Sequence, residues 1–265
     1  SDFSVDFITK IGNDFNGNFL MEEMKRDEVT PRFIIGNGES TAITIAISFK
    51  DGERHFITQL GAMDSFSSED INRSIFKHFH HVAYRGIWFA KKLLYDAASI
   101  MKAAKETGAS TSMDLGFDPL WATNHPDVPK RKQAALGAIK YVDYLFGNEK
   151  EFMNLTDTCS MDEAIRVLRD HEVNTMVIHM GSKGAKILSP KAIIDVPVFK
   201  VDIKNPVGSG DTFDAVFIGS ILEELSLKEA GTQAAAAAAY SISNSPGTKL
   251  SRENIAKITL EHCNQ

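Results

Sequence analysis

Two kinds of hydrophobic pattern follow one another along this chain. Residues 33–60 hold three short β-rich runs, separated by Gly36-Asn37-Gly38 and Asp51-Gly52. An Asp-Gly pair between two such runs is a strong hairpin signal. Because no helical segment separates the runs, the pattern predicts an antiparallel patch. We expect residues 32–60 to form a small β-sheet inserted in the main domain as a lid or a dimer surface; an edge meander without function is the alternative.

Outside this region, strand-like apolar runs alternate with segments of helical spacing. Residues 5–11 predict a strand, and residues 19–26 predict a helix. Further strands are expected at 81–84, 111–114, 144–146 and 176–179, a hairpin at 186–188 and 193–194, and helices at 91–107, 132–140, 161–171, 212–222, 230–243 and 253–261. This alternation predicts an α/β fold in three layers, with a mostly parallel central sheet covered by helices on both faces.

Composition narrows the class of protein. The 265 residues are 43% hydrophobic, which is enough to bury one large domain over residues 1–265. The net charge of −6 gives no basic surface for nucleic acid. Cys159 and Cys263 lie far apart, so we expect neither a disulfide framework nor a zinc site but a reducing, cytoplasmic setting. We find no apolar run that could span a membrane and no signal peptide.

The stretch Gly208-Ser209-Gly210-Asp211 carries the most specific chemistry. Glycines allow a tight turn, and a turn that opens a helix directs free N–H groups and the positive end of the helix dipole at one point. Asp211 in the first helical turn would stand beside a bound anion and could take a proton from an attacking hydroxyl. An anion site with a carboxylate base is the minimum for phosphoryl transfer to an alcohol. The alternative is a glycine-rich loop with Asp211 as a plain N-cap.

Two more loops follow predicted strands. Asn148 and Glu151 lie three residues apart at a helix start, where they could hold the water shell of Mg²⁺ or form a capping box, or both. Gly181 and Gly184 suit a nucleotide lying on the backbone, or an ordinary hairpin turn. The alanine run 234–239 indicates a tightly packed helix, although small side chains would also let a flat base lie against it.

The order Asn-x-x-Glu, Gly-x-x-Gly, Gly-x-Gly-Asp and an alanine-rich helix closed by Pro246-Gly247 resembles the PfkB, or ribokinase-like, carbohydrate kinases. Residues 10–17 and 51–54 resemble that family's early strand–turn–helix and its lid hairpin. The resemblance covers essentially the whole chain. It implies an ATP- and Mg²⁺-dependent kinase that phosphorylates an alcohol of a sugar or a similar small molecule.

The resemblance also implies roles for individual residues. Asp211 would be the general base, and Gly208, Ser209 and Gly210 would form the anion hole. The other implied roles are Mg²⁺ and phosphate organisation by Asn148 and Glu151, nucleotide contact by Gly181, Gly184 and Ala236, and binding of a monovalent cation such as K⁺ by Asn205, Val207 and Ser251. A homodimer through the lid edge is a further expectation.

The chain departs from the family pattern at several positions. Asn205-Pro206 stands where Asp-Thr is frequent, which weakens the case for the cation. The stretch 114–121 lacks the Asn and Arg of a frequent family element, so it gives no support for a phosphorylated substrate. The family's first strand and its Gly-Gly sugar-binding element would precede residue 1. We interpret them as lying outside the given sequence, because an unpaired central strand would be a costly defect.

Three other functions compete with a sugar kinase. A kinase of the same fold could act on a nucleoside or a vitamin-like alcohol. A sugar- or nucleotide-binding relative without activity would have no need of an intact Asp211. A dinucleotide-binding oxidoreductase would need a Gly-x-Gly-x-x-Gly after a first strand, which is absent from this sequence.

Overall fold

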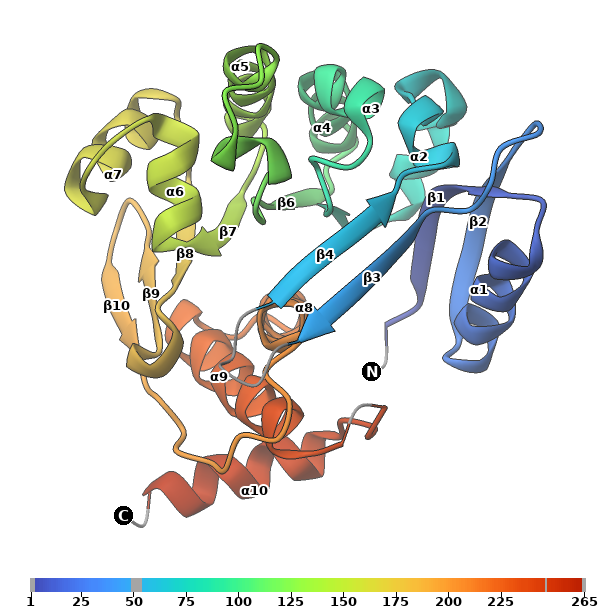
Figure 1. The fold of residues 1–265 in the computed structure, drawn as a ribbon. Helices are drawn as coiled ribbons and strands as arrows, with labels where there is room; N and C mark the ends of the chain where they lie inside the picture. Colours follow the sequence, from blue (N-terminus) through green and yellow to red (C-terminus); the bar gives the residue numbers. More distant parts are fainter. Residues whose placement is uncertain (1–2, 49–53, 246, 264–265) are drawn as a thin grey trace. The chain divides into compact units, whose positions relative to one another are not determined.

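The structure, a computed structural model, describes residues 3–48, 54–245 and 247–263 (Figure 1). Its residues group into two compact units. We call the first the sheet unit; it comprises Ser110–Leu115 and Ile139–Gln265, together with residue 1. We call the second the N-terminal unit; it comprises Asp2–Ala109 and Gly116–Ala138. The expectation of one domain over residues 1–265, with an inserted lid, stays a prediction, and each unit is described by itself.

The sheet unit is built on five strands in the order β10-β9-β8-β7-β6. Their bounds are β6 Ser110–Asp114, β7 Tyr144–Asn148, β8 Thr175–His179, β9 Ala185–Leu188 and β10 Ile193–Val196. Strands β6, β7 and β8 pair in parallel, and β8, β9 and β10 pair antiparallel. The parallel pairing and the β9–β10 hairpin are as predicted.

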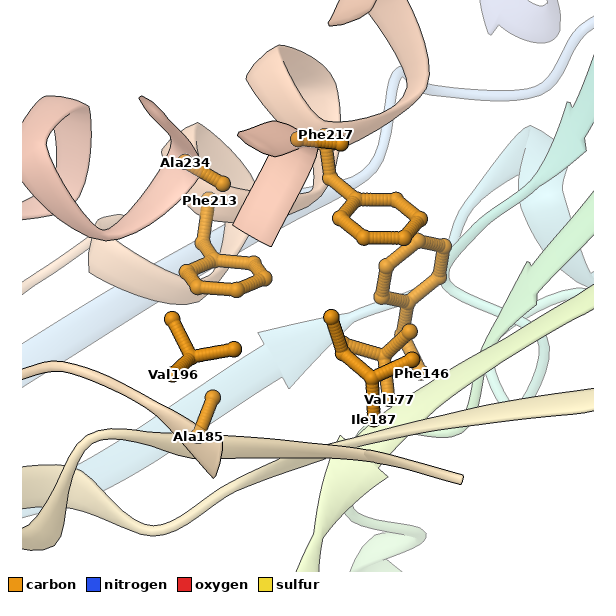
Figure 2. Packing of buried hydrophobic residues seen from close by; sticks show 9 residues of the cluster. Phe146, Val177, Ala185, Ile187, Val196, Phe213, Phe217 and Ala234 are labelled. Atoms are coloured by element: carbon orange, nitrogen blue, oxygen red, sulfur yellow. The ribbon is translucent and has the colours of Figure 1, made fainter. Parts of the chain in front are cut away.

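Helices cover both faces of this sheet (Figure 1). They are α6 Glu149–Thr156, α7 Met161–Asp170, α8 Ser209–Leu222 and α9 Leu227–Ser243, and α10 Arg252–Cys263 packs against α9. Helices α8 and α9 pack on one face, where Phe213 and Phe217 point at Val177, Ile187 and Val196 (Figure 2). Burying each phenylalanine contributes roughly 1.5–3 kcal/mol to folding. The predicted three-layer α/β arrangement is therefore present within this unit.

The N-terminal unit contains the remaining elements. They are β1 Val5–Gly12, α1 Phe15–Arg26, β2 Val29–Gly36, β3 Ile43–Ser48, β4 Arg54–Gln59, α2 Ala62–Ser65, β5 His81–Tyr84, α3 Lys91–Tyr95, α4 Ala97–Glu106, most of α5 Val128–Ile139, and three short 3₁₀ turns at Ser68–Asp70, Arg73–His78 and Pro119–Ala122. Its core is centred on Phe66, Phe76 and Leu93. Strands β3 and β4 pair antiparallel as expected, and the turn between them lies outside the described residues.

Two predictions for this unit were wrong in detail. Strand β2 does not join the antiparallel patch but pairs in parallel with β1. Helix α1 connects the two strands, and a crossover helix is what allows parallel pairing. The helix predicted over residues 91–107 is broken at Asp96, which ends α3 and begins α4 with non-helical backbone angles. The helical spacing of apolar residues continues across such a break and does not reveal it.

A close-packed junction joins β1, α1 and the segment that leads into β3. Asp14 caps α1 by accepting the Gly17 N–H at 2.8 Å, and it also accepts the Thr41 N–H at 2.8 Å and the Thr41 hydroxyl at 2.6 Å. The Thr41 hydroxyl bond is the largest cause of the lowered pKa of Asp14. A Cβ on Gly12 would lie 2.6 Å from the Thr41 nitrogen and 2.7 Å from the Ser40 carbonyl carbon. Glycine is therefore required at position 12 by the close approach of another backbone.

We expect Gly12→Ala to lower the free energy of unfolding by about 1–3 kcal/mol, because the new methyl group overpacks a backbone that cannot move aside. Gly137→Ala is the matched control: a Cβ there meets nothing within 4 Å, and Gly137 lies inside α5. Alanine favours a helix, so the control is expected to be neutral or stabilising. Urea unfolding of both variants measures the difference. Equal stability of the two variants would contradict the packing described for the junction.

Candidate active site

The candidate site residues all belong to the sheet unit, and several lie where its parallel strands end. Asn148 ends β7, His179 ends β8, and the two are register partners. Asp114 ends the neighbouring β6. The carboxyl ends of parallel strands form the edge at which α/β folds bind ligands. This edge therefore gathers one amide, one imidazole and one carboxylate from three strands.

The first turn of α8 contains the residues that the sequence predicts as an anion site. Gly208 is the N-cap residue, with φ at 81°, and no side chain caps the helix. The first helical bond runs from the Thr212 N–H to the Gly208 carbonyl at 2.9 Å. The amides of Ser209 and Gly210 precede that bond, where the geometry of a helix offers them no acceptor within the helix. Such amides and the helix dipole together favour an anion.

Asp211 is the third residue of α8 and its side chain is exposed. The alternative interpretation, with Asp211 as the N-cap, is wrong, because Gly208 holds that position. A left-handed residue at the cap leaves the helix end without a competing side-chain oxygen. Asp211 is thus placed beside the amides and open to a reacting group. Its role as a general base stays a prediction at this point.

Asn148 and Glu151 form the capping box that the sequence offered as an alternative. The Asn148 side-chain oxygen accepts the Glu151 N–H at 3.0 Å, and Glu151 Oε2 accepts the Asn148 N–H at 2.8 Å. The pKa of Glu151 is raised, mainly by burial, although the bond from Asn148 and the nearby His179 lower it. This cap fixes both side chains at the end of β7. Whether they also organise Mg²⁺ stays a prediction.

The loop with Gly181 and Gly184 connects β8 to β9 as a short 3₁₀ turn, Gly181–Lys183. Its strands pair antiparallel, so the hairpin interpretation is confirmed. Both glycines have positive φ, 57° and 89°. A Cβ on Gly184 would also collide with the Val196 carbonyl oxygen. These constraints explain the two glycines without a ligand, and contact with a nucleotide stays a prediction.

The alanine run of α9 is tightly packed, as predicted. Ala234, Ala236 and Ala237 are fully buried. Ala236 packs in a cluster with Phe199 and Ala239. The structure therefore accounts for Ala236 by packing, and its contact with adenine is untested.

The three residues expected to bind a monovalent cation fall in two places. Asn205 and Val207 share one turn, in which the Asn205 side-chain oxygen accepts the Val207 N–H at 3.2 Å. Ser251 precedes α10, and its hydroxyl donates to Asn254 Oδ1 at 2.6 Å. Each polar side chain thus has a local partner. Within the described part of the chain, no cluster of three or more His, Cys, Asp or Glu residues is arranged to hold a metal ion.

Sequence reasoning missed a buried pair beneath the anion site. His179 Nε2 lies 2.9 Å from Oδ1 of Asp214, which is one helical turn beyond Asp211. Only 2% of the Asp214 side chain is exposed, against 21% for His179. The histidine ring stacks on Phe146 at 6.4 Å and meets the edge of Phe213 at 5.1 Å. A polar residue at a strand end and an acid three residues after Asp211 were the available signals.

The contact with Asp214 influences the pKa of the His179 imidazole. Burial is the largest single influence on His179 and lowers its pKa. The Asp214 carboxylate raises the pKa, and its effect together with smaller ones from Asp114 and Glu151 outweighs burial, so the net direction is upward. The charges of Asp214, Asp114 and Glu151 thus all influence the protonation of His179. The protonated, ion-paired state of His179 is favoured over a wider pH range than for a free histidine.

Comparison with known proteins points to one family. The model of the pfkB family carbohydrate kinases matches residues 2–254. Probable fructokinase-3 of Arabidopsis thaliana is 24% identical over 229 residues, which cover 84% of this chain and 65% of that protein. Aminoimidazole riboside kinase of Salmonella typhimurium is 24% identical over 247 residues, which cover 91% of this chain and 74% of that protein. The chain thus spans about two thirds of the length of the first of these relatives.

The fold has close counterparts among solved structures. An Escherichia coli protein described as ribokinase II, in complex with ATP and Mg²⁺, matches with a TM-score of 0.84 at 20% sequence identity. The match covers 100% of this chain and 84% of that chain. At this level of identity the similarity shows the fold, and it confirms the predicted ribokinase-like α/β architecture. Among the described residues, no helix is both long and apolar enough to cross a membrane.

The raised pKa of His179 predicts a pH-dependent contribution to stability. A histidine whose pKa is higher in the folded state contributes fully below about pH 6.5, and the contribution is lost as pH rises through the folded pKa. We expect the difference in unfolding free energy between wild type and His179→Gln to be larger at about pH 6 than at about pH 9. Urea unfolding at both pH values measures it, with His171→Gln, at an exposed histidine of the same unit, as control. An equal difference at both values would contradict the pairing.

Proposed function

Because this chain belongs to the pfkB family of carbohydrate kinases, as its motif order predicted, we propose that it phosphorylates a hydroxyl group of a sugar or a related small molecule with ATP. The observation that carries the proposal is the open first turn of α8. Its amides have no helical acceptor and no capping side chain, and Asp211 stands exposed beside them. An anion site and a carboxylate occur together on one rigid helix.

In the proposed reaction, the substrate hydroxyl loses its proton to the Asp211 carboxylate as its oxygen attacks the γ-phosphorus of ATP. The bond between that phosphorus and the β–γ bridging oxygen breaks, and ADP leaves. The amides of Ser209 and Gly210 and the dipole of α8 stabilise the negative charge on the transferring phosphoryl group. Asp211 afterwards releases its proton to solvent. The protein supplies mainly position and charge, as expected for phosphoryl transfer.

Mg²⁺ would be held by few protein ligands. Asn148 and Glu151 sit together at the end of β7, and the raised pKa of Glu151 reflects a carboxylate whose charge is poorly solvated. A divalent ion that keeps most of its waters could be bound through them and the phosphates. When bound, it would neutralise phosphate charge. The relative from Escherichia coli that contains ATP and Mg²⁺ supports both cofactors for this chain.

Nucleotide contact by Gly181, Gly184 and Ala236 and a K⁺ site at Asn205, Val207 and Ser251 are weaker parts of the proposal. The two glycines lie at the end of β8, at the ligand-binding edge. The turn of Asn205 and Val207 directly precedes the anion site, but its amide oxygen already accepts a hydrogen bond. Running every assay with and without K⁺ tests the cation directly.

Two substrate classes are open. A fructokinase relative favours a free sugar, and the riboside kinase relative favours a nucleoside-like alcohol. Both reactions need the same base and anion site, so the geometry of α8 does not choose between them. A panel of sugars, sugar phosphates and nucleosides, assayed for ATP consumption by the full-length protein, distinguishes them.

We expect Asp211→Asn to lower kcat by about 10²–10⁴-fold, because the amide cannot accept the hydroxyl proton. ATP binding, measured by calorimetry, is expected to persist. Asp195→Asn is the matched control, since Asp195 is an exposed carboxylate of β10 that pairs with Lys186 at 3.3 Å. Full activity of Asp211→Asn on the true substrate would contradict the proposal. Equal loss in the control would point to a general effect of charge.

The β3–β4 hairpin carries an exposed apolar face. Ile43, Ile45 and Ile47 alternate along β3, and Ile57 is the register partner of Ile45. Ile45 and Ile57 are 56% and 61% exposed, which is unusual for isoleucine. We propose that this face meets the same face of a second copy in a homodimer. Two identical apolar faces can cover each other about a twofold axis.

Ile45→Asp is expected to convert a dimer into a monomer in sedimentation velocity, because two carboxylates would be brought together in an apolar interface. Thr44→Asp, on the opposite face of the same strand, is the control and should stay dimeric. A monomeric wild-type protein would refute the dimer. An unchanged oligomeric state with a raised KM for the sugar would favour a lid instead.

A further inference from the structure

Apolar side chains form a cluster between α8 and the sheet. Phe146, Val177, Phe213 and Phe217 belong to it (Figure 2). Asp214 enters the same interface from α8 and is 1% exposed. A lone carboxylate in such a place is costly, and the imidazole of His179 compensates it from β8 at 2.9 Å. An ionic contact therefore joins the helix to the strand beside this hydrophobic cluster.

The same imidazole lies directly beneath the anion site. A Cβ built on Gly210 would be 3.6 Å from His179 Nδ1 and 3.7 Å from its Cε1, which is ordinary van der Waals contact. The ring is held from the sides by Phe146 and Phe213. The His179 ring thus lies next to Gly210, with room for one methyl group between them, and its Nε2 contacts Asp214. Asp214 follows Asp211 by three residues on the same helix.

An apolar interface alone leaves a helix some freedom to slide and rotate, since dispersion contacts have little directionality. An ion pair adds a distance-dependent attraction between two particular atoms, here His179 Nε2 and Asp214 Oδ1. Replacing a buried ion pair with well-packed apolar residues is often neutral or stabilising, so stability alone gives a weak reason for the pair. Catalytic groups, in contrast, must be held within about 0.5 Å of a productive geometry. His179 and Asp214 lie next to the first turn of α8, whose proposed catalytic groups would need this precision.

We propose that His179 and Asp214 are positioning residues that fix the first turn of α8 against the end of β8. Through this contact the amides of Ser209 and Gly210 and the carboxylate of Asp211 keep their places at the transferring phosphoryl group. Neither residue touches a reacting atom. The kinetic consequence rests on the proposed kinase activity, whereas the structural consequence does not.

The structural consequence is tested first and without any substrate. The double variant His179→Leu/Asp214→Leu removes both polar groups and leaves no unpaired buried charge. Backbone amide chemical shifts of Ser209, Gly210 and Asp211 are compared with wild type by NMR. Ser220→Ala is the matched control: Ser220 is buried on the same helix, far along from its first turn, and donates to Gln233 at 3.2 Å. We expect the three amide signals to move in the double variant and to stay in place in the control.

Unchanged amide signals in a folded double variant would overturn the inference. If the double variant does not fold, His179→Gln is compared in its place. Glutamine keeps an N–H donor but lacks the imidazole ring that lies next to Gly210. Movement of the same signals in Ser220→Ala would also overturn the inference, because any cavity along α8 would then produce the effect.

The kinetic consequence follows on the full-length protein with the substrate identified from the panel. We expect the double variant to lose about 10- to 100-fold in kcat, the size of effect that a misplacement near 1 Å produces, with KM for both substrates little changed. His179→Gln should retain more of kcat than the double variant, and Ser220→Ala should match wild type. A wild-type kcat in the double variant refutes the positioning role. A wild-type protein that consumes no ATP refutes the proposed function instead, and the amide comparison still decides the positioning role.

Discussion

Helix α8 is under two opposite demands, and the sheet unit is arranged to satisfy both. Its middle turns must be dry, because Phe213 and Phe217 form the packing surface against β7, β8 and β9. Its first turn must be open for the proposed function, because the amides there would bind the anion. The change from open to buried happens within one turn, between the exposed Asp211 and the buried Asp214. A shift of α8 that buried its middle turns more deeply would also bury its first turn. A shift that exposed the first turn further would also expose the middle turns.

Much of this arrangement could be predicted from the sequence. The alternation of apolar runs and helical spacing located most strands and helices, and Gly-Ser-Gly-Asp located the start of α8. Strand partners were harder, as β2 shows: its residues have the same β propensity whether it pairs with β1 or with β3. Pairing depends on the crossover through α1, which is a property of three-dimensional packing. The break at Asp96 was invisible for a similar reason, since the hydrophobic stripe continues through it.

The sequence likewise predicted some features of the candidate site and missed others. Residues that act through the backbone, such as Gly208, were predictable because their chemistry is local. The contact of His179 with Asp214 joins residues 35 positions apart by side chains alone, and neither belongs to a recognisable motif. Several predicted site residues also have structural duties, as the Asn148–Glu151 cap and the packing of Ala236 show. A residue type explained by packing is compatible with a second role but gives no independent support for it.

The left-handed Gly208 at the start of α8 has a thermodynamic consequence for the whole unit. A side-chain oxygen at the N-cap commonly completes the start of a helix, and glycine in its place costs only about a few tenths of a kcal/mol. In α8 that oxygen is missing, so a phosphate group bound there, as the proposed function requires, would complete the helix as well as occupy a site. Ligand binding and helix stability are then two descriptions of the same hydrogen bonds. At a concentration 100 times its dissociation constant, a ligand of the folded state adds about 2.7 kcal/mol to stability. On the proposed function, the bound nucleotide would therefore also stabilise the start of α8.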